Sequence, residues 1–398
     1  MKGRRGFTSK SRKDPHAYMK KSVLLIRSNP VNPDPPVEKM ANELVALGYD
    51  VSILGWDRSD NYDKREESLT MANGIVQRIT FGIKASFGAG FRGNFSPLLK
   101  FETRLKGWLK NEGTKFDAIH AFDFDTGFTA YRFCRRNSKV LIYHLLDYYI
   151  DAHSINNSLI ATVVSCLEKK VINYADAVII CTEKRKAQIA GSHPKQLYVI
   201  HNTPDINQIN KRHFLVNRES NRIKIVYVGI LVESRLLKEI TSVVVNNDSF
   251  EFHVGGFGLL EGFFEEISRN STNVYYYGKL PYNETLALER DCDVMVAIYD
   301  PSIRNNQFAA PNKFYESLML GKPIIMAKNT GFDDIIEKNR LGVLIDYSID
   351  GVEKGLKEIQ SLKNLWDEMS KKGQQLYCEQ YSWEIMKERI NNLYKGLV

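Results

Sequence analysis

The feature that most limits the fold is an alternation of short apolar runs with segments of helical periodicity. In the first half, the runs lie at 23–26, 51–54, 117–122, 139–146, 176–181 and 197–200. Strands buried on both faces have such continuous runs, and they form mostly parallel sheets with helices on both sides. After a polar stretch the pattern restarts at "IKIVYVGIL" and recurs five more times. The sequence therefore predicts an α/β protein with two doubly wound, Rossmann-like domains that face each other across a cleft.

The same pattern gives the domain boundaries. We expect a basic, disordered tail at 1–21, a first domain at 22–205, a polar linker at 206–221 and a second domain at 222–375. A chain of 398 residues with 43% hydrophobic residues can supply both domains with cores. Five scattered cysteines without metal-ligand spacing indicate reduced thiols in a cytoplasmic protein. No apolar run is long enough for a membrane span, and the amino terminus lacks the apolar segment of a signal peptide.

The charge is unevenly placed. The net charge is +8, and the tail at 1–21 holds eight basic residues against Asp14 alone, so the body is nearly neutral. A nearly neutral body argues against nucleic-acid binding. Two interpretations of the tail stay open, a solubilising leader and a contact with anionic lipid.

A second basic segment lies at 81–110. Its aromatic and basic residues are interleaved and include Phe81, Phe87, Phe91, Phe95, Trp108, Lys84, Arg92, Lys100, Arg104 and Lys110. This composition is typical of an element at a membrane surface. The alternative is an amphipathic helix that packs on the core.

The stretch "APNKFYESLMLGKPII" at 310–325 carries the clearest functional signal. Pro311 suits a first helical position, and Gly321 followed by Pro323 ends a helix of about ten residues before a strand. Lys313 in the first turn opposes the helix dipole, which is favourable only if an anion binds there. Glu316, one turn later, could accept hydrogen bonds from ribose hydroxyls. The alternative is a surface Lys-Glu pair, although Lys before Glu is the poorer order.

These residues resemble the donor-site helix of retaining family 4 glycosyltransferases, in the branch that has P-N-K-x-x-E followed by G-K-P. The resemblance covers nearly the whole folded chain: "FDAIHAFDFDTG", "VLIYHLLDYY", "VIHNTPD" and "VYVGILVESRLLKEI" occur in the expected order. It implies the GT-B fold, with an acceptor-binding first domain and a nucleotide-sugar-binding second domain. The closing segment 376–398, with "YSWEIMKERINNLY", resembles the helix that crosses back onto the first domain.

The resemblance also implies roles for individual residues. The donor diphosphate would be held by Arg235, Lys238 and Lys313, the ribose by Glu316 and the nucleobase near Lys279 and Leu280. Asn312 is a further donor-binding candidate. Gly255, Gly256 and Gly258 would allow close backbone approach. Asp123, His144 and Asp147 end strands expected to face the acceptor and are the catalytic candidates. Neither a metal nor a cofactor is expected, since cations can stabilise the departing diphosphate.

Three positions depart from the family pattern. Phe308 stands where many members have a second Glu, Pro36 where an Arg is usual, and Leu146 where a His is expected. They affect the acceptor side more than the donor side. A competing D-x-D metal signal at 123–125 and 291–293 is a triplet that is common by chance.

The expected function is therefore sugar transfer with retention, from a UDP- or GDP-sugar to a glycan or lipid-linked acceptor in cell-surface polysaccharide or glycoconjugate synthesis. The protein would act in the cytoplasm, with peripheral contact to the anionic inner face of the membrane as an open option. A nucleotide-sugar 2-epimerase of the same fold and a non-catalytic partner subunit that binds nucleotide-sugar are the alternatives.

Overall fold

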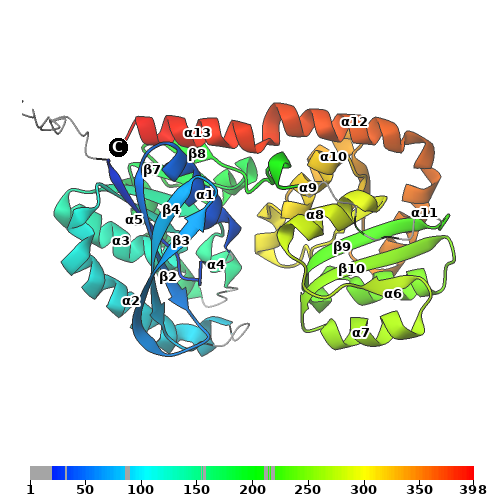
Figure 1. The fold of residues 1–398 in the computed structure, drawn as a ribbon, viewed down its shortest axis with the longest axis horizontal. Coiled ribbons are helices and arrows are strands. Elements are labelled where there is room, and N and C mark those ends of the chain that lie inside the picture. The colour runs from blue at the N-terminus through cyan, green and yellow to red at the C-terminus, as the bar shows by residue number, and fades with distance from the viewer. Residues whose placement is uncertain are drawn as a thin grey trace, which may run out of the picture.

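The computed structural model describes residues 20–31, 34–85, 90–153, 155, 158–209, 214, 216 and 220–398. Nearly all of the tail predicted at 1–21, and half of the linker predicted at 206–221, lie outside these residues. Two domains lie side by side, and the C-terminal helices run along both of them (Figure 1). No helix in the described part of the chain is long and apolar enough to cross a membrane.

The first domain is built on an eight-stranded sheet with the strand order β3-β4-β2-β1-β5-β6-β7-β8. Its strands are β1 (Ser22–Ile26), β2 (Asp50–Asp57), β3 (Tyr62–Met71), β4 (Gly74–Gly82), β5 (Ala118–Phe122), β6 (Val140–Leu145), β7 (Ala177–Ile180) and β8 (Leu197–Val199). All neighbours pair in parallel except β3, which is antiparallel to β4 at the edge of the sheet.

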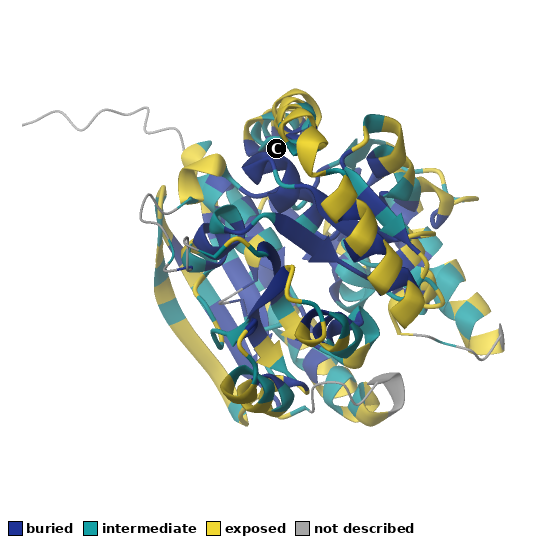
Figure 2. Ribbon diagram, turned by 90° about the vertical axis from the view of Figure 1, so that its right-hand side faces the viewer, coloured by how far each residue is buried: buried dark blue, intermediate teal, exposed yellow. Residues whose placement is uncertain are grey.

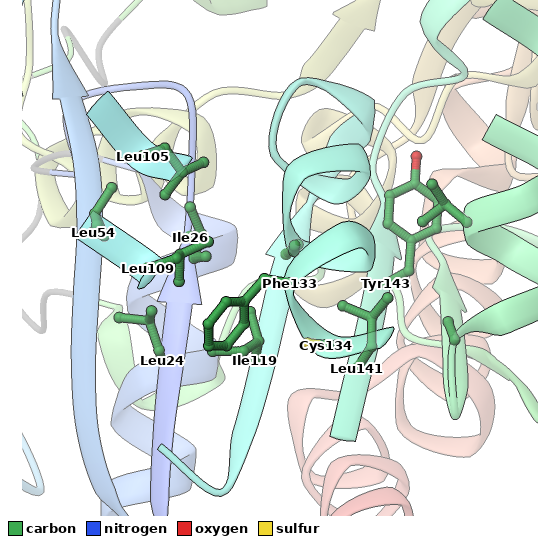
Figure 3. Close-up of a cluster of buried hydrophobic side chains, with 14 of the residues drawn as sticks. Leu24, Ile26, Leu54, Leu105, Leu109, Ile119, Phe133, Cys134, Leu141 and Tyr143 are labelled. Carbon is green, nitrogen blue, oxygen red and sulfur yellow. The ribbon is translucent and has the colours of Figure 1, made fainter. Parts of the chain in front are cut away.

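Helices cover both faces of this sheet. They are α1 (Pro35–Ala46), α2 (Gly90–Glu112), α3 (Asp123–Asn137), α4 (Tyr149–Ala152) and α5 (Ser158–Tyr174), with the short turns η1 (Gly113–Lys115), η2 (Glu183–Ala187) and η3 (Ile206–Gln208). The buried faces of α2, α3 and α5 form one core with the strands. Figure 3 shows part of it, with Leu105 and Leu109 near the strands that carry Leu24, Ile26 and Leu54. The opposite face packs against α1 and the last helix of the chain.

The second domain has a six-stranded parallel sheet in the order β11-β10-β9-β12-β13-β14. The strands are β9 (Ile223–Leu231), β10 (Phe250–Gly258), β11 (Val274–Tyr276), β12 (Val294–Ala297), β13 (Ile324–Ala327) and β14 (Gly342–Ile345). The helices are α6 (Leu237–Val245), α7 (Glu261–Asn270), α8 (Tyr282–Asp291), α9 (Asn312–Leu320), α10 (Asp333–Asn339) and α11 (Ile349–Ser361), with η4 (Glu233–Arg235), η5 (Arg304–Phe308) and η6 (Lys363–Leu365). One core lies under α6, α7 and α11, and another under α8, α9 and α10.

The chain then returns to the first domain. Helix α12 (Trp366–Leu376) packs on α9, a π-helical turn η7 (Tyr377–Tyr381) follows, and α13 (Trp383–Lys395) lies against the first domain (Figure 1). In the view turned by 90°, most strands are buried in the middle of the molecule and the helices expose their outer faces, whereas the edge strand β3 is largely exposed (Figure 2).

Two sequence-based expectations need correction. Strands β3 and β4 were not expected. Strand β3 is an edge strand whose charged residues face solvent, so it has no apolar run to reveal it. Helix α9 begins at Asn312, with Pro311 as its N-cap rather than its first helical residue. Its end is as expected, because Gly321 adopts a left-handed conformation with φ of 64°.

Candidate functional site

Lys313 lies in the first turn of α9, among aromatic and acidic side chains. Its Nζ is 3.9 Å from Oε1 of Glu289 on α8 and 5.1 Å from the centre of the Tyr227 ring on β9. Only 12% of the side chain is exposed. Burial lowers the pKa of Lys313, but the charges of Glu316 and Glu289 outweigh it and raise this pKa to about 12. Lys313 is therefore a buried ammonium ion at neutral pH.

Two buried carboxyl groups face this one ammonium. Glu316 accepts a hydrogen bond at Oε1 from the Tyr282 hydroxyl (3.0 Å), and its Oε2 has no partner among the described residues. Glu289 is fully buried, and within the same residues neither of its oxygens has a hydrogen-bond partner. Burial, together with the charge of Glu316, raises the pKa of Glu289 well above its ordinary value. The free Oε2 of Glu316 is an acceptor that a ligand hydroxyl could use.

Arg235 supplies a second cation next to Tyr227. It lies in η4, after β9, and its guanidinium carbon is 3.5 Å from the centre of the Tyr299 ring. Burial raises the pKa of Tyr227, whereas the charges of both Lys313 and Arg235 lower it, so the two cations flank one phenol. A Cβ at Gly229 would lie 3.2 Å from the Tyr227 hydroxyl and 3.4 Å from Nζ of Lys313. Glycine at this position therefore keeps the space beside Tyr227 and Lys313 free of a side chain.

Lys238 is separate from this group. Its Nζ is 2.7 Å from Oε1 of Glu233 and 5.5 Å from the Phe263 ring on α7, and both members of the ion pair are exposed. Asn312, by contrast, is at the start of α9 and accepts a hydrogen bond from Asn202 of the first domain (3.0 Å). The structure therefore places Arg235 and Lys313 next to Tyr227, and Glu316 next to Lys313. Lys238 is paired with Glu233 instead.

The glycines at the end of β10 make room chiefly for the neighbouring strand. A Cβ at Gly256 would lie 1.8 Å from the carbonyl oxygen of Gly229, and one at Gly258 would lie 2.7 Å from that of Leu231. Both have positive φ, 129° and 143° respectively, which favours glycine. The predicted approach of a ligand to these glycines stays a prediction.

The expected nucleobase segment lies beside the same strand end. A Cβ at Gly255 would be 3.2 Å from Leu280, whose side chain packs against the core under α8 and α9. Lys279 is exposed, with its Nζ 5.0 Å from the centre of the Phe257 ring. These side chains are at the carboxyl ends of β10 and β11, where ligands of parallel sheets bind.

On the first domain, Asp123 connects the carboxyl ends of three strands. Its carboxylate accepts hydrogen bonds from the backbone N–H groups of Leu146 (2.8 Å) and Asp147 (3.1 Å) after β6. Its other oxygen pairs with Arg27, which follows β1 and also binds Asp34 (3.0 Å). Asp123 has φ of 58°, so its backbone is held in the left-handed region. Such strain occurs often at functional sites.

Asp147 lies where the two domains touch. One of its oxygens accepts hydrogen bonds from Arg185 of the first domain (2.8 Å) and from Asn305 in η5 of the second domain (2.9 Å). Phe308, the residue that replaces an expected Glu, ends the same turn. Asp147 is therefore engaged in an interdomain contact, and its partner Asn305 lies seven residues before the start of α9.

His144 is buried away from solvent. Its Nδ1 is 3.2 Å from Nε2 of His120, whose Nδ1 is 2.7 Å from the Tyr394 hydroxyl on α13. Burial, followed by the charges of His120 and Arg27, lowers the pKa of His144 well below its ordinary value, so the ring is neutral. It lines a cavity of only about 10 Å³ with Pro36 and Leu146. The expectation that His144 faces an acceptor is not met, because its ring lies 3% exposed inside the domain.

Several residues of the site escaped the sequence analysis. Tyr227, Tyr282, Tyr299 and Glu289 on the donor side, and Arg27 on the acceptor side, have contacts that only the fold brings together. For Glu289 the sequence does contain one signal: this carboxylate directly follows the mostly apolar segment 285–288, and the structure buries all of these residues. Arg27 follows directly after the apolar run of β1, at the edge where sites form.

Known proteins match this chain in part by sequence and throughout by fold. Residues 37–208 match the family model described as Glycosyltransferase Family 4. Comparison with curated protein sequences finds no match. The solved structures that match include sucrose-phosphate synthase from Thermosynechococcus elongatus, with a TM-score of 0.72, 16% identity and coverage of 95% of this chain and 99% of that chain.

Two further structures are similar. The α,α-trehalose-phosphate synthase (UDP-forming) from Burkholderia xenovorans, in complex with glucose-6-phosphate, has a TM-score of 0.68 and 11% identity, and the match covers 95% of this chain and 100% of that one. Anabaena Alr3699/HepE, in complex with UDP-glucose, has a TM-score of 0.63 and 14% identity, with coverage of 94% and 100%. The predicted GT-B fold is confirmed, and the family matched by the first domain agrees with the predicted enzyme class.

Proposed function

We propose that the chain is a retaining glycosyltransferase that uses a UDP-sugar, with a GDP-sugar as the other option, in the cytoplasm. The observation that carries this proposal is the group formed by Arg235, Lys313 and Glu316 around Tyr227, at the start of α9 and the end of β9. Two cations and a helix N-terminus suit a diphosphate, and the free Oε2 of Glu316 suits a ribose hydroxyl. The HepE structure with UDP-glucose supports the choice of UDP.

The reaction follows from these groups. The bond between the sugar C1 and the diphosphate oxygen breaks, and an acceptor oxygen bonds to C1 on the same face. The acceptor proton passes to the departing phosphate oxygen, so no protein base is required. Lys313 and Arg235 stabilise the charge that develops on the diphosphate. The acceptor would be a glycan or a lipid-linked sugar in cell-surface polysaccharide or glycoconjugate synthesis.

Calorimetry with UDP, GDP and ADP tests the donor site. Lys313→Ala and Arg235→Ala should each weaken binding by about 10- to 150-fold, since a charge-assisted contact contributes roughly 1.5–3 kcal/mol. Lys238→Ala is the matched control, because this lysine lies one turn beyond Arg235 and is paired with Glu233. Loss of affinity in the control alone, or in none of the three, would contradict the assignment.

Product analysis then identifies the reaction. A transferase changes the acceptor, whereas an epimerase changes the donor sugar with no acceptor present. Binding without any turnover would favour the non-catalytic subunit. Retention is read from the anomeric configuration of the product by NMR.

A membrane contact of the first domain is also proposed. A groove of about 310 Å³ between α2 and α3 has Leu109 and Phe133 in its lining and four cations along it, Lys106, Lys110, Arg132 and Arg136. No ion pair of these four occurs among the described residues. Trp108, the expected membrane anchor, is partly buried and packs against the core and Phe116, so the proposal is based on the four cations instead.

Sedimentation with anionic vesicles tests this contact. Replacing Lys106 and Arg136 by Ala should reduce binding at low salt, because salt screens such attraction. Replacing Lys64 and Lys357, which are paired on other surfaces, is the control. No sedimentation of the intact protein at low salt would favour a soluble acceptor.

A further inference from the structure

A polar pocket lies in the first domain, apart from the donor group. It has a volume of about 280 Å³ and is lined by the end of β2, by β3 and β4, and by Pro30 after β1. Its lining includes three arginines, Arg58, Arg65 and Arg78, together with Thr80. We call it the arginine pocket. A volume near 300 Å³ is at the lower end of the range for small-ligand sites.

The acidic residues of this pocket are already engaged. Asp57 accepts hydrogen bonds from the Ser59 backbone N–H (2.8 Å), from the Ser59 hydroxyl (2.6 Å) and from the Tyr62 hydroxyl (3.0 Å). Glu67 receives two hydrogen bonds from Arg78, at 3.2 and 2.7 Å. Arg78 is thus balanced by Glu67, whereas Asp57 keeps its charge, so three arginines and two carboxylates leave the pocket lining with a net charge of +1.

Arg58 and Arg65 have no carboxylate within ion-pair distance in the part of the chain that the structure describes. Arg58 lies 4.2 Å from the centre of the Trp56 ring and donates from Nη2 to the carbonyl oxygen of Ser28 (3.0 Å). Its Nε is buried and has no acceptor among those residues. Arg65 lies 4.4 Å from the centre of the Tyr62 ring. Both guanidinium groups are therefore fixed by aromatic rings and keep donors to spare.

Thr80 is an independent sign of a binding site in this pocket. It is 5% exposed, and its hydroxyl has no hydrogen-bond partner among the described residues. A buried hydroxyl without a hydrogen-bond partner destabilises a fold, so buried hydroxyls are nearly always hydrogen-bonded. The Thr80 hydroxyl and the two arginines line the same pocket and are all hydrogen-bond donors.

The arginine pocket adjoins the acceptor side of the molecule. Ser28 accepts from Arg58 through its carbonyl oxygen and donates through its hydroxyl to Asp125 (2.9 Å). Asp125 is in the first turn of α3, two residues after Asp123. The pocket is thus linked to the carboxyl ends of β1, β2 and β5, the edge where an α/β sheet binds its ligands.

We propose that the arginine pocket binds a phosphate group of the acceptor, with Arg58, Arg65 and Thr80 as donors to its oxygens. Arginine forks match the oxygens of phosphate, and a hydroxyl can donate to another oxygen of the same group. The proposal rests on the proposed function, because it takes the ligand to be the acceptor of sugar transfer. The phosphate could be the monoester of a soluble sugar phosphate or the diphosphate of a lipid-linked acceptor.

Direct binding measurements test the pocket without any turnover. Glucose 6-phosphate and geranyl diphosphate serve as probes of the two phosphate sources, and glucose is the neutral comparison. One phosphate probe should bind the intact protein at least tenfold more tightly than glucose. Binding of neither probe, or equal binding of glucose and glucose 6-phosphate with no binding of geranyl diphosphate, would overturn the proposal.

Two variants separate a ligand role from a structural one. Arg65→Ala, at an exposed position, should lower the affinity for the phosphate probe about tenfold or more. Thr80→Val removes the unpaired hydroxyl at nearly constant shape. It should therefore raise the melting temperature and yet lower the affinity for the same probe. Lys64→Ala is the matched control, because it removes a neighbouring cation on β3 that is paired with Glu66. Unchanged probe affinity in both Arg65→Ala and Thr80→Val would overturn the proposal.

The same samples distinguish this proposal from the proposed function. UDP binding should be unchanged in Arg65→Ala and Thr80→Val, since neither residue belongs to the donor group. If the intact protein binds the phosphate probe but no nucleotide, the pocket stands and the donor assignment fails. If it binds UDP but no phosphate probe, the donor assignment stands and the pocket assignment fails.

Discussion

Replacing Lys313 by Met removes the one ammonium that faces Glu289 and Glu316, while it keeps most of the side-chain volume. In the wild-type protein, Lys313 can balance one of these buried carboxylates. Without Lys313, the carboxyl group that it balanced must also take up a proton, because leaving that charge buried and unpaired would cost more free energy than protonating it. The destabilisation should therefore depend on pH.

The magnitude follows from the cost of that proton. A carboxyl group with an ordinary pKa near 4.3 takes up a proton at a cost of about 1.4 kcal/mol for each pH unit above that value. The cost is about 5 kcal/mol at pH 8 and about 1 kcal/mol at pH 5. For a domain of this size, 1 kcal/mol corresponds to roughly 2–4 °C, so Lys313→Met should lower the melting temperature by about 10–20 °C at pH 8 and about 2–4 °C at pH 5.

Differential scanning calorimetry at the two pH values measures this effect. The double variant Lys313→Met/Glu289→Gln has one buried carboxyl group fewer than the single variant, so it should recover most of the loss at pH 8. Lys238→Met, which removes an exposed cation, should stay close to wild type at both pH values. An equal loss at pH 5 and pH 8, or a double variant no more stable than the single one, would show that the loss comes from packing and would refute the electrostatic reasoning.

Three further predictions concern other parts of the molecule. Burial raises the pKa of Glu168 to about 8, above its value in the unfolded chain, so the stability that this group contributes at low pH is lost as pH rises from about 4.5 to 8; melting temperatures across that range should fall less steeply in Glu168→Gln. Gly256→Ala should destabilise the second domain by roughly 1–3 kcal/mol in urea unfolding, because its φ is 129° and its Cβ would clash with Gly229. Gly107→Ala in α2 places a Cβ with no atom within 4 Å among the described residues, so it should stabilise the protein by about 0.5–1 kcal/mol. Transfer activity should persist in excess EDTA, since cations hold the diphosphate; loss of activity with rescue by Mn²⁺ would instead implicate the D-x-D at 123–125.

The strands with continuous apolar runs could be predicted because burial on both faces leaves a mark in the sequence itself. Strand β3 could not, since an antiparallel edge strand with charged residues has no such run. The end of α9 was predictable from Gly321, whose positive φ is a local property of one residue. Elements were thus recognisable where their stability depends on local chemistry or on full burial.

The candidate site divides in the same way. Lys313 and Glu316 were recognisable because they lie one turn apart on a single helix. Glu289 and Tyr227 come from α8 and β9, and only the packing of the second domain places them next to Lys313. His144 was misjudged, because a position at the end of a strand does not show whether the side chain faces solvent or the core. Contacts between distant segments are the part that periodicity cannot supply.

Helix α9 links the donor group to the contact between the domains. Lys313 and Glu316 face groups of the second domain, whereas Asn312 and Tyr315 contact Asn202 (3.0 Å) and His201 (2.8 Å) of the first. Both sets of contacts start within one short, mostly buried helix. Because the helix is rigid, it cannot move relative to the first domain without disturbing its contacts within the second domain. Movement of the first domain at His201 and Asn202 would therefore shift Lys313 relative to Glu289 and Tyr227, so the spacing of the donor group depends on how the two domains meet.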